Sequence, residues 1–384
     1  MSSKLLVFIF CLCILRSTNA DDFPNADILV SLEEIAEDIK NLNKRSEKNL
    51  PDISKIKKST LKREDIEKYI HKIRARNLQM NIIDDLGNNL SGLDLSNLDF
   101  RGAIMNNIVM VGCDVSGSVF SGAIMEGVDM RNVKAIGANF TGTNVAGGSF
   151  ENANLSYASF NNTFGNNANF TGANLSNATI ADAEFQEVNF SSVNLDNAQL
   201  QRSQFQMSDF SNSTARNAVL LSSTLAKAEI DNSDWTDVDM TSANASYAKF
   251  SNSKLINAKM FSGNFAHTDF NNVIMGNAYA EGVDFSSTKF ENSILTGSVL
   301  ANSSFNKAKI TNSQMQRCVL NDVTLHDVDL SNTTLESSLM KDVSLTGVNL
   351  DGTKLIKVFL SLTKIDNVDL SKAVIQQSVI SSSN

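Results

Sequence analysis

The sequence predicts an all-β solenoid, in which the chain coils in a square around one apolar core. Every fifth residue over 95–380 is apolar and mostly bulky, which makes 58 positions with Gly165 as the one that is not apolar. Two places before each of them lies a residue that is almost always valine or smaller. This register continues from residue 91 without a single insertion.

A period of five residues fits neither a helix nor a strand. A helix of 3.6 residues per turn would spread these positions around every face, and a strand would place successive ones on opposite faces. The pattern therefore predicts a chain that turns a corner every five residues. Four corners close a coil of about 20 residues, and stacked coils pair their backbones about 4.8 Å apart, giving about 14 coils and a tower of about 70 Å.

Two stretches carry a resemblance to a known family. "GANLS" at 172–176 and "VNLDN" at 193–197 match the consensus of the pentapeptide-repeat family, which is close to Ala-(Asp/Asn)-Leu-x-x. The resemblance covers 91–384. It implies a right-handed quadrilateral β-helix, here of about 14 coils at 20 residues each.

Residues 20 apart are expected to stack in columns inside the tower. One column holds phenylalanine at 150, 170, 190 and 210, isoleucine at 230, and phenylalanine at 250, 270 and 290. Gly165 leaves one core position empty, and Phe164 beside it either tilts inward or stays exposed. Cys113 and Cys318 fall on the small inward position about ten coils apart, too far for a disulfide. We expect both to be buried and inert.

The first twenty residues predict a secretory signal peptide over 1–20. Lys4 precedes an apolar run over 5–15, and Thr18 and Ala20 stand at the minus-three and minus-one positions of a cleavage site. The run is short for a membrane span, and no other long apolar stretch follows it. The sequence therefore predicts an exported chain without a transmembrane anchor, located outside the cell, in a periplasm or in a secretory compartment.

Residues 21–90 differ from the repeat and predict a small helical segment. Apolar residues at 28, 32, 35, 39 and 42 mark one amphipathic helix, which either packs within the chain or joins two chains as a short coiled coil. Lysine and arginine between 44 and 58 form a basic, flexible stretch. A second helix is expected from about Lys62 to Arg76. It would cap the first coil, where Leu93, Leu98 and Ile108 enlarge the apolar end.

No catalytic constellation is visible. His71, His267 and His326 are far apart in the sequence, no His/Cys cluster has metal-ligand spacing, and no phosphate-binding loop occurs. A filled core leaves no pocket of its own. The sequence predicts a protein that is no enzyme and binds no cofactor or metal.

The preferred function is an exported structural scaffold or protein-binding rod, and two alternatives stay open. The resemblance allows an acidic rod that mimics nucleic acid, as in family members that protect DNA gyrase. However, 18 basic and 28 acidic residues over 91–384 give a thin charge density beside duplex DNA, so nucleic-acid partners are not expected. The other alternative is a surface or matrix protein that binds mineral, ice or glycan. An ice-binding solenoid would carry a column of threonines 20 residues apart, whereas Asn161 and Ala181 follow Thr141 in this column.

One outward column changes from polar to apolar and is the candidate interface. Six apolar residues follow one another 20 apart, which indicates an interaction surface in the C-terminal third. Some family members pair through their C-terminal ends, so we expect self-association or docking of another protein there. The column consists of Tyr279, Val299, Val319, Leu339, Phe359 and Val379.

Many outward asparagines form Asn-x-Ser/Thr sequons, which would carry glycans if the source is eukaryotic. The repeat itself generates most of them, so they do not identify the source. The candidate sites are Asn139, Asn154, Asn169, Asn174, Asn189, Asn244, Asn302 and Asn332.

Overall fold

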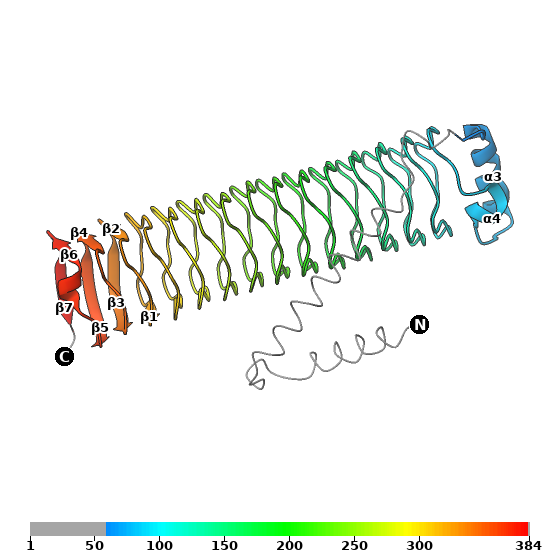
Figure 1. The fold of residues 1–384 in the computed structure, drawn as a ribbon. Coiled ribbons are helices and arrows are strands. Elements are labelled where there is room, and N and C mark those ends of the chain that lie inside the picture. The colour runs from blue at the N-terminus through cyan, green and yellow to red at the C-terminus, as the bar shows by residue number, and fades with distance from the viewer. Residues whose placement is uncertain (1–58, 383–384) are drawn as a thin grey trace, which may run out of the picture. The chain divides into compact units, whose positions relative to one another are not determined.

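A computed structural model describes residues 59–382 of the chain. They belong to one compact unit that spans 56–384. Figure 1 shows this unit as a stack of coils with two helices at its N-terminal end and the labelled strands at its C-terminal end. The expected signal peptide, the amphipathic helix over 28–42 and the basic stretch over 44–58 lie outside the described residues.

Each coil has four sides, and one residue on each side bridges to the residue 20 positions later. Bridges such as Asp94 to Asp114 and Asp99 to Val119 are parallel, and they continue up the stack with this spacing. Each coil also hydrogen-bonds to the next: the Leu95 N–H donates to the Asp114 carbonyl at 2.7 Å. The predicted four-sided coil of 20 residues is confirmed.

The corners depend on a left-handed residue. At many corners the small inward residue donates its N–H to the carbonyl of the bulky residue three places earlier, as Ala103 does to Phe100 at 3.0 Å. At others, such as Ala183, the N–H donates to a serine hydroxyl of the next coil. The third residue of that turn has a positive φ, for example 56° at Asn152 and 66° at Gly172, within a range of about 51–79° over the corners of the coils. Such a turn favours glycine and asparagine at this place, which explains their abundance in the repeat.

Among the described coils, only the last ones have sides regular enough to count as strands. One sheet has the order β1-β3-β5-β7 and the other β2-β4-β6, all parallel. The strands are β1 (Thr324–His326), β2 (Thr334–Glu336), β3 (Leu339–Thr346), β4 (Lys354–Ile356), β5 (Phe359–Asp366), β6 (Val374–Gln376) and β7 (Val379–Ser382), and a 3-10 helix, η3 (Leu370–Lys372), precedes β6.

Aromatic columns fill the core as the sequence predicts. In the predicted column, successive rings such as Phe150 and Phe170 stack with centroids 4.6 Å apart. A neighbouring column meets it edge-on, and the Phe160 ring lies 5.8 Å from Phe170 at 82°. Trp235 is fully buried, and its indole N–H donates to the Ser213 hydroxyl at 3.0 Å. Offset-stacked and edge-to-face pairs of this kind are the favoured aromatic geometries.

The neighbouring coil fills the empty core position at Gly165. A Cβ placed on Gly165 would lie 2.0 Å from Cε1 of Phe185, so the Phe185 ring occupies the space that a side chain would take. Phe164 is 50% exposed. Of the two alternatives for Phe164, the outward one is therefore correct.

Both cysteines of the repeat are buried and free, as predicted. The Cys113 thiol donates to the Leu90 carbonyl at 2.9 Å and the Cys318 thiol to the Leu295 carbonyl at 3.1 Å. Burial raises the pKa of Cys113 to about 11 and that of Cys318 to about 12. Neutral thiols of this kind are poor nucleophiles.

Two helices close the N-terminal end of the stack. Helix α3 (Arg63–Ala75) lies where the sequence predicts a helix, and it buries Ile66, Ile70 and Ile73 together with Tyr69. Helix α4 (Ile82–Leu86) was not predicted. Backbone pairing also starts before residue 91, since Asn81 bridges Ile104 and Asn89 bridges Val109.

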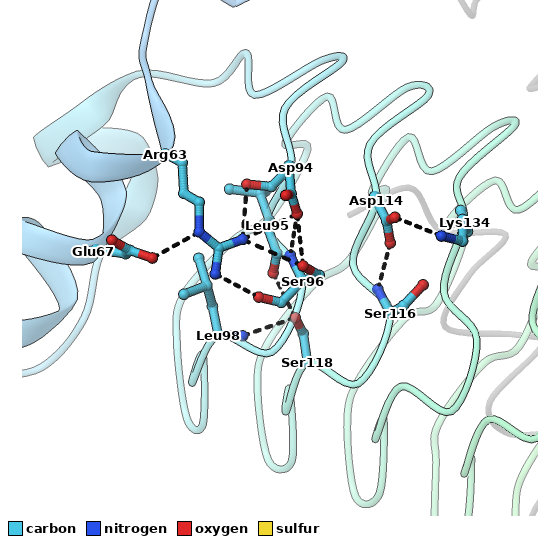
Figure 2. Close-up of polar contacts among 10 residues, drawn as sticks. All are labelled: Arg63, Glu67, Asp94, Leu95, Ser96, Leu98, Asp114, Ser116, Ser118 and Lys134. Atoms are coloured by element: carbon cyan, nitrogen blue, oxygen red, sulfur yellow. Dashed lines mark hydrogen bonds and ion pairs between the residues drawn. The ribbon is translucent and has the colours of Figure 1, made fainter.

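Arg63 of α3 ties this helix to the first coil (Figure 2). Its guanidinium lies 3.0 Å from the Asp94 carboxylate and donates to the Ser96 carbonyl at 2.9 Å, while Glu67 of the same helix lies 2.7 Å away. The apolar side chains of α3 belong to the same core cluster as Leu90, Leu95 and Leu98. The helix thus covers core that the first coil would otherwise expose.

The last coil departs from the predicted inward pattern. Ile365 and Ile375 occupy bulky positions, yet they are 41% and 40% exposed, because no further described coil covers them. Leu362 stands at a corner position and is nevertheless buried. It pairs with Val343 across a register shift between β3 and β5, so the strict five-residue phase does not hold in this coil.

Candidate protein-binding stripe on the C-terminal coils

The six residues of the predicted column lie on successive coils and form what we call the C-terminal stripe. Tyr279 bridges Val299, which bridges Val319, and Val319 bridges Leu339. The register continues from Leu339 to Phe359 and then to Val379. These last three are the first residues of β3, β5 and β7, at the end of the stack in Figure 1.

Most of the stripe is open to solvent. Tyr279 is 47% exposed, Phe359 45% and Val379 58%, and Leu339 is also exposed. Val299 and Val319 are half-buried. Large apolar side chains seldom gather on a free surface without a partner. Sequence reasoning missed Phe261, whose ring lies 6.1 Å from that of Tyr279 and extends the apolar surface by one coil. Spacing could not reveal this contact, because Phe261 stands at a corner and belongs to another column.

A polar hollow lies at the corner that precedes the stripe on the same coils. Its volume is about 430 Å³. An apolar centre with a polar rim is the usual composition of a protein interface. The hollow is lined by Thr296, Gln314, Gln316, Arg317, Glu336 and Ser337.

No further coil among residues 59–382 covers the end of the stack next to the stripe. β7 and β6 are the last strands of their sheets, so each has one edge without a strand partner among residues 59–382. The exposed side chains of Ile365 and Ile375 lie in this coil. An unpaired edge beside exposed core is a template for another chain.

The sequon asparagines fall into two groups. Asn244, Asn302 and Asn332 are exposed, whereas the five others are half-buried. The half-buried ones each accept a backbone N–H two residues later, as Asn169 does from Thr171 at 2.9 Å. Their use for glycosylation stays a prediction. The half-buried group consists of Asn139, Asn154, Asn169, Asn174 and Asn189.

Two other kinds of site are absent from the described residues. Over residues 59–382, no group of three or more His, Cys, Asp or Glu side chains could hold a metal ion. Within the same range, no helix has the length and apolar character needed to span a membrane. The stripe is thus the candidate site that both the sequence and the geometry indicate.

Comparisons with known proteins point to one family and to repeat proteins of solved structure. The family model described as "Pentapeptide repeats" matches 113–221, 223–260, 264–336 and 344–381 in overlapping copies. No curated protein matches the chain.

Solved structures similar to the chain include other repeat proteins. QnrB1, a plasmid-mediated fluoroquinolone resistance protein, is 19% identical over 47% of this chain and 88% of its own, with a TM-score of 0.38. HetL, involved in heterocyst differentiation regulation in the cyanobacterium Nostoc sp. strain PCC 7120, is 16% identical over 82% of this chain and 97% of its own, with a TM-score of 0.24. Identities and TM-scores this low say nothing about function.

Proposed function

Because the chain belongs to the pentapeptide-repeat family, we propose that it is a non-enzymatic, exported binding rod that pairs with a second copy of itself through the C-terminal stripe. The observation that carries the proposal is the stack of apolar side chains from Tyr279 to Val379. From the family we also infer the right hand of the coil and a length of about 14 coils of 20 residues.

A second copy suits this surface better than an unrelated partner. The stripe ends at the last described coil, where β6 and β7 each have an edge without a strand partner among residues 59–382 and Ile365 and Ile375 are exposed. The same end of another molecule offers the same features, and a two-fold axis would cover both ends at once. A free edge left unpaired would instead favour uncontrolled association.

The test replaces two stripe residues by lysine. Val319→Lys together with Leu339→Lys places charges among apolar side chains that face outward, so the dimer should be lost while the core stays folded. Sedimentation velocity measures the mass, and circular dichroism checks the fold. Thr179→Lys with Gln199→Lys, in the same column nearer the N-terminus, is the matched control and should leave the dimer intact.

Two results would contradict this function. One is an unaltered protein that stays monomeric at the highest concentration it tolerates. The other is a Val319→Lys, Leu339→Lys variant that still pairs. In the second case the free ends of the last coil, rather than the stripe, would hold the copies together.

Export is proposed from the predicted signal peptide over 1–20. If the source is eukaryotic, we expect glycans first at the exposed Asn244, Asn302 and Asn332. Fractionation of cells and medium, with the mass of the mature chain before and after glycan removal, checks both points. A chain that stays in the cytosol with residues 1–20 attached would refute export.

Nucleic-acid mimicry is less well supported, because the acidic side chains are neutralised locally. Glu229, Asp234 and Asp239 lie on three sides of one coil. The next coil places lysine above each of them, with Lys249 only 3.1 Å from Glu229. A polyanion mimic needs uninterrupted negative charge along its length.

A further inference from the structure

One corner of the coil is built from unusual residues over seven successive coils. Each of these residues has a left-handed φ of 56–61°, and none of them is asparagine or glycine. On another corner of the same stack, asparagine fills six successive coils from Asn212 to Asn312. We call the first set the corner ridge. It consists of Glu187, Met207, Lys227, Tyr247, His267, Ser287 and Lys307.

These residues are unfavourable choices for the backbone they adopt. Long and aromatic side chains resist a positive φ, whereas asparagine and glycine tolerate it. Strain that recurs at one place is a reason to look for a function of the side chains. On the ridge the side chains point away from the core, and Met207, Tyr247 and His267 are all exposed.

The middle of the ridge presents an aromatic pair. The Tyr247 and His267 rings stack on each other with centroids 4.5 Å apart and planes 5° from parallel. Tyr247 is 51% exposed. Asn264 is exposed on the side just before this corner, and its amide oxygen accepts the Ala266 N–H at 3.0 Å. Its side-chain N–H groups can therefore donate hydrogen bonds to a ligand.

The upper part of the ridge carries a cluster of lysines. Lys307 stands at the corner, and Lys289 and Lys309 bridge each other on the side that follows it. All three are exposed. Among residues 59–382, no carboxylate lies within ion-pair distance of these three ammonium groups, unlike Lys249, which contacts Glu229 at 3.1 Å. Asp269 lies on the same side, between Lys249 and Lys289.

We propose that the corner ridge from Tyr247 to Lys307, together with Lys289 and Lys309 on the side beside it, binds an extended acidic polysaccharide. The C–H faces of sugar rings would pack on the exposed aromatic pair, because an aromatic side chain offers a rigid apolar surface. Sugar carboxylates or sulfates would pair with Lys289, Lys307 and Lys309. The site lies apart from the C-terminal stripe and adds a ligand to the proposed function without depending on it.

A single-stranded nucleic acid fits the ridge less well. Such ligands need separated aromatic platforms in a basic groove, whereas Tyr247 and His267 stack on each other. A linear polymer along the stack meets equivalent positions about every 4.8 Å, which suits the repeated units of a polysaccharide.

The experiment measures binding of two acidic polymers to the full mature chain by calorimetry at low salt. Heparin is the sulfated probe and polygalacturonate the carboxylated one; dextran is the neutral control and oligo(dT) the nucleic-acid control. Tyr247→Asn with His267→Asn should weaken binding about tenfold and leave the melting temperature equal or higher, because asparagine suits this φ. Lys289→Gln, Lys307→Gln and Lys309→Gln together should weaken it as much.

Two control variants match these changes. Tyr157→Asn removes an aromatic residue at a different corner. Tyr157 has the same φ as Tyr247, 61°, and is 64% exposed. Lys354→Gln, Lys357→Gln and Lys364→Gln remove three exposed lysines elsewhere. Both should bind like the parent. Binding of polygalacturonate would show that carboxylates suffice, whereas binding of heparin alone would show that sulfates are needed.

The proposal is overturned if neither acidic polymer binds, if ridge and control variants bind equally, or if oligo(dT) binds more tightly than both polysaccharides. Sedimentation of the same samples reports pairing through the stripe. A loss of polysaccharide binding with pairing intact, or the reverse, separates the two proposals.

Discussion

Gly165 and Phe185 show how a single residue shapes the core. The Phe185 ring enters the space above Gly165 and meets Phe160 and Phe170 edge-on, at 6.2 and 5.7 Å. The sequence predicts the empty position but not its occupant. That choice depends on the rotamer of a ring one coil away, which the five-residue pattern does not encode.

Gly165→Ala should therefore destabilise the protein. The new methyl group would lie about 2.0 Å from the Phe185 ring, and relief of such overpacking costs about 1–3 kcal/mol. Urea unfolding measures the change. Gly276→Ala is the control, because its nearest neighbour lies 3.5 Å away and its φ is not positive. Equal unfolding midpoints for both variants would show that Phe185 can move aside freely.

At the scale of elements, the N-terminal helices depend on ionic contacts with the first coils. Arg74 of α3 lies 3.2 Å from Asp99, and Arg101 of the coil lies 2.7 Å from the same carboxylate. The pKa of Asp99 is lowered to about 2, chiefly by the hydrogen bond from Arg101 and also by the charge of Arg74. Together with Arg63 on Asp94, these contacts hold α3 on the apolar end.

Asp99 should make stability depend on pH in the acid range. The pKa of Asp99 is lower in the folded chain than the value of about 3.9 in an unfolded one. Its contribution to the free energy of unfolding is therefore complete above about pH 4 and is lost as the pH falls toward about 2. Asp99→Asn should lower the urea midpoint at pH 6. In this variant the urea midpoint should also decrease less between about pH 4 and about pH 2 than it does in the parent. Asp366→Asn, an exposed residue at the end of β5, is the control. An unchanged slope in Asp99→Asn would exclude this residue as the cause.

The elements also show where sequence reasoning works and where it fails. Helix α3 could be predicted because Ile66, Ile70 and Ile73 repeat at helical spacing. Helix α4 has only five residues, too few for a period to emerge. The register shift at Leu362 could not be predicted, because the five-residue pattern of the sequence continues through this coil without a change. The stripe could be predicted because its members share one column, whereas the corner ridge becomes visible only when φ is known at each corner.

At the scale of the whole molecule, stability rests on an unbroken register. Asn194 bridges Asn174 in the coil before it and Thr214 in the coil after it. One additional residue after Asn194 would move every later side chain one position along the repeat, so that outward polar groups face the core. We expect a melting temperature at least several degrees lower, measured by circular dichroism.

The same insertion after Ser381 is the control, since no described strand stacks beyond β7. It should melt like the parent. If the insertion after Asn194 also melts like the parent, a corner can absorb an additional residue as a local bulge. The predicted dependence on register would then be wrong.

The direction of the hydrogen bonds between coils has a mechanical consequence. Bonds such as that from the Phe100 N–H to the Val119 carbonyl, at 2.7 Å, lie along the stack, and each side pairs only with the coils before and after it. A force applied to the two ends loads a few bonds of the outermost coil at a time, so coils should peel off in sequence. Each one gives up about 4.8 Å of height and releases about 70 Å of chain. A rod of this kind that is held at both ends would lengthen stepwise under tension, one coil at a time.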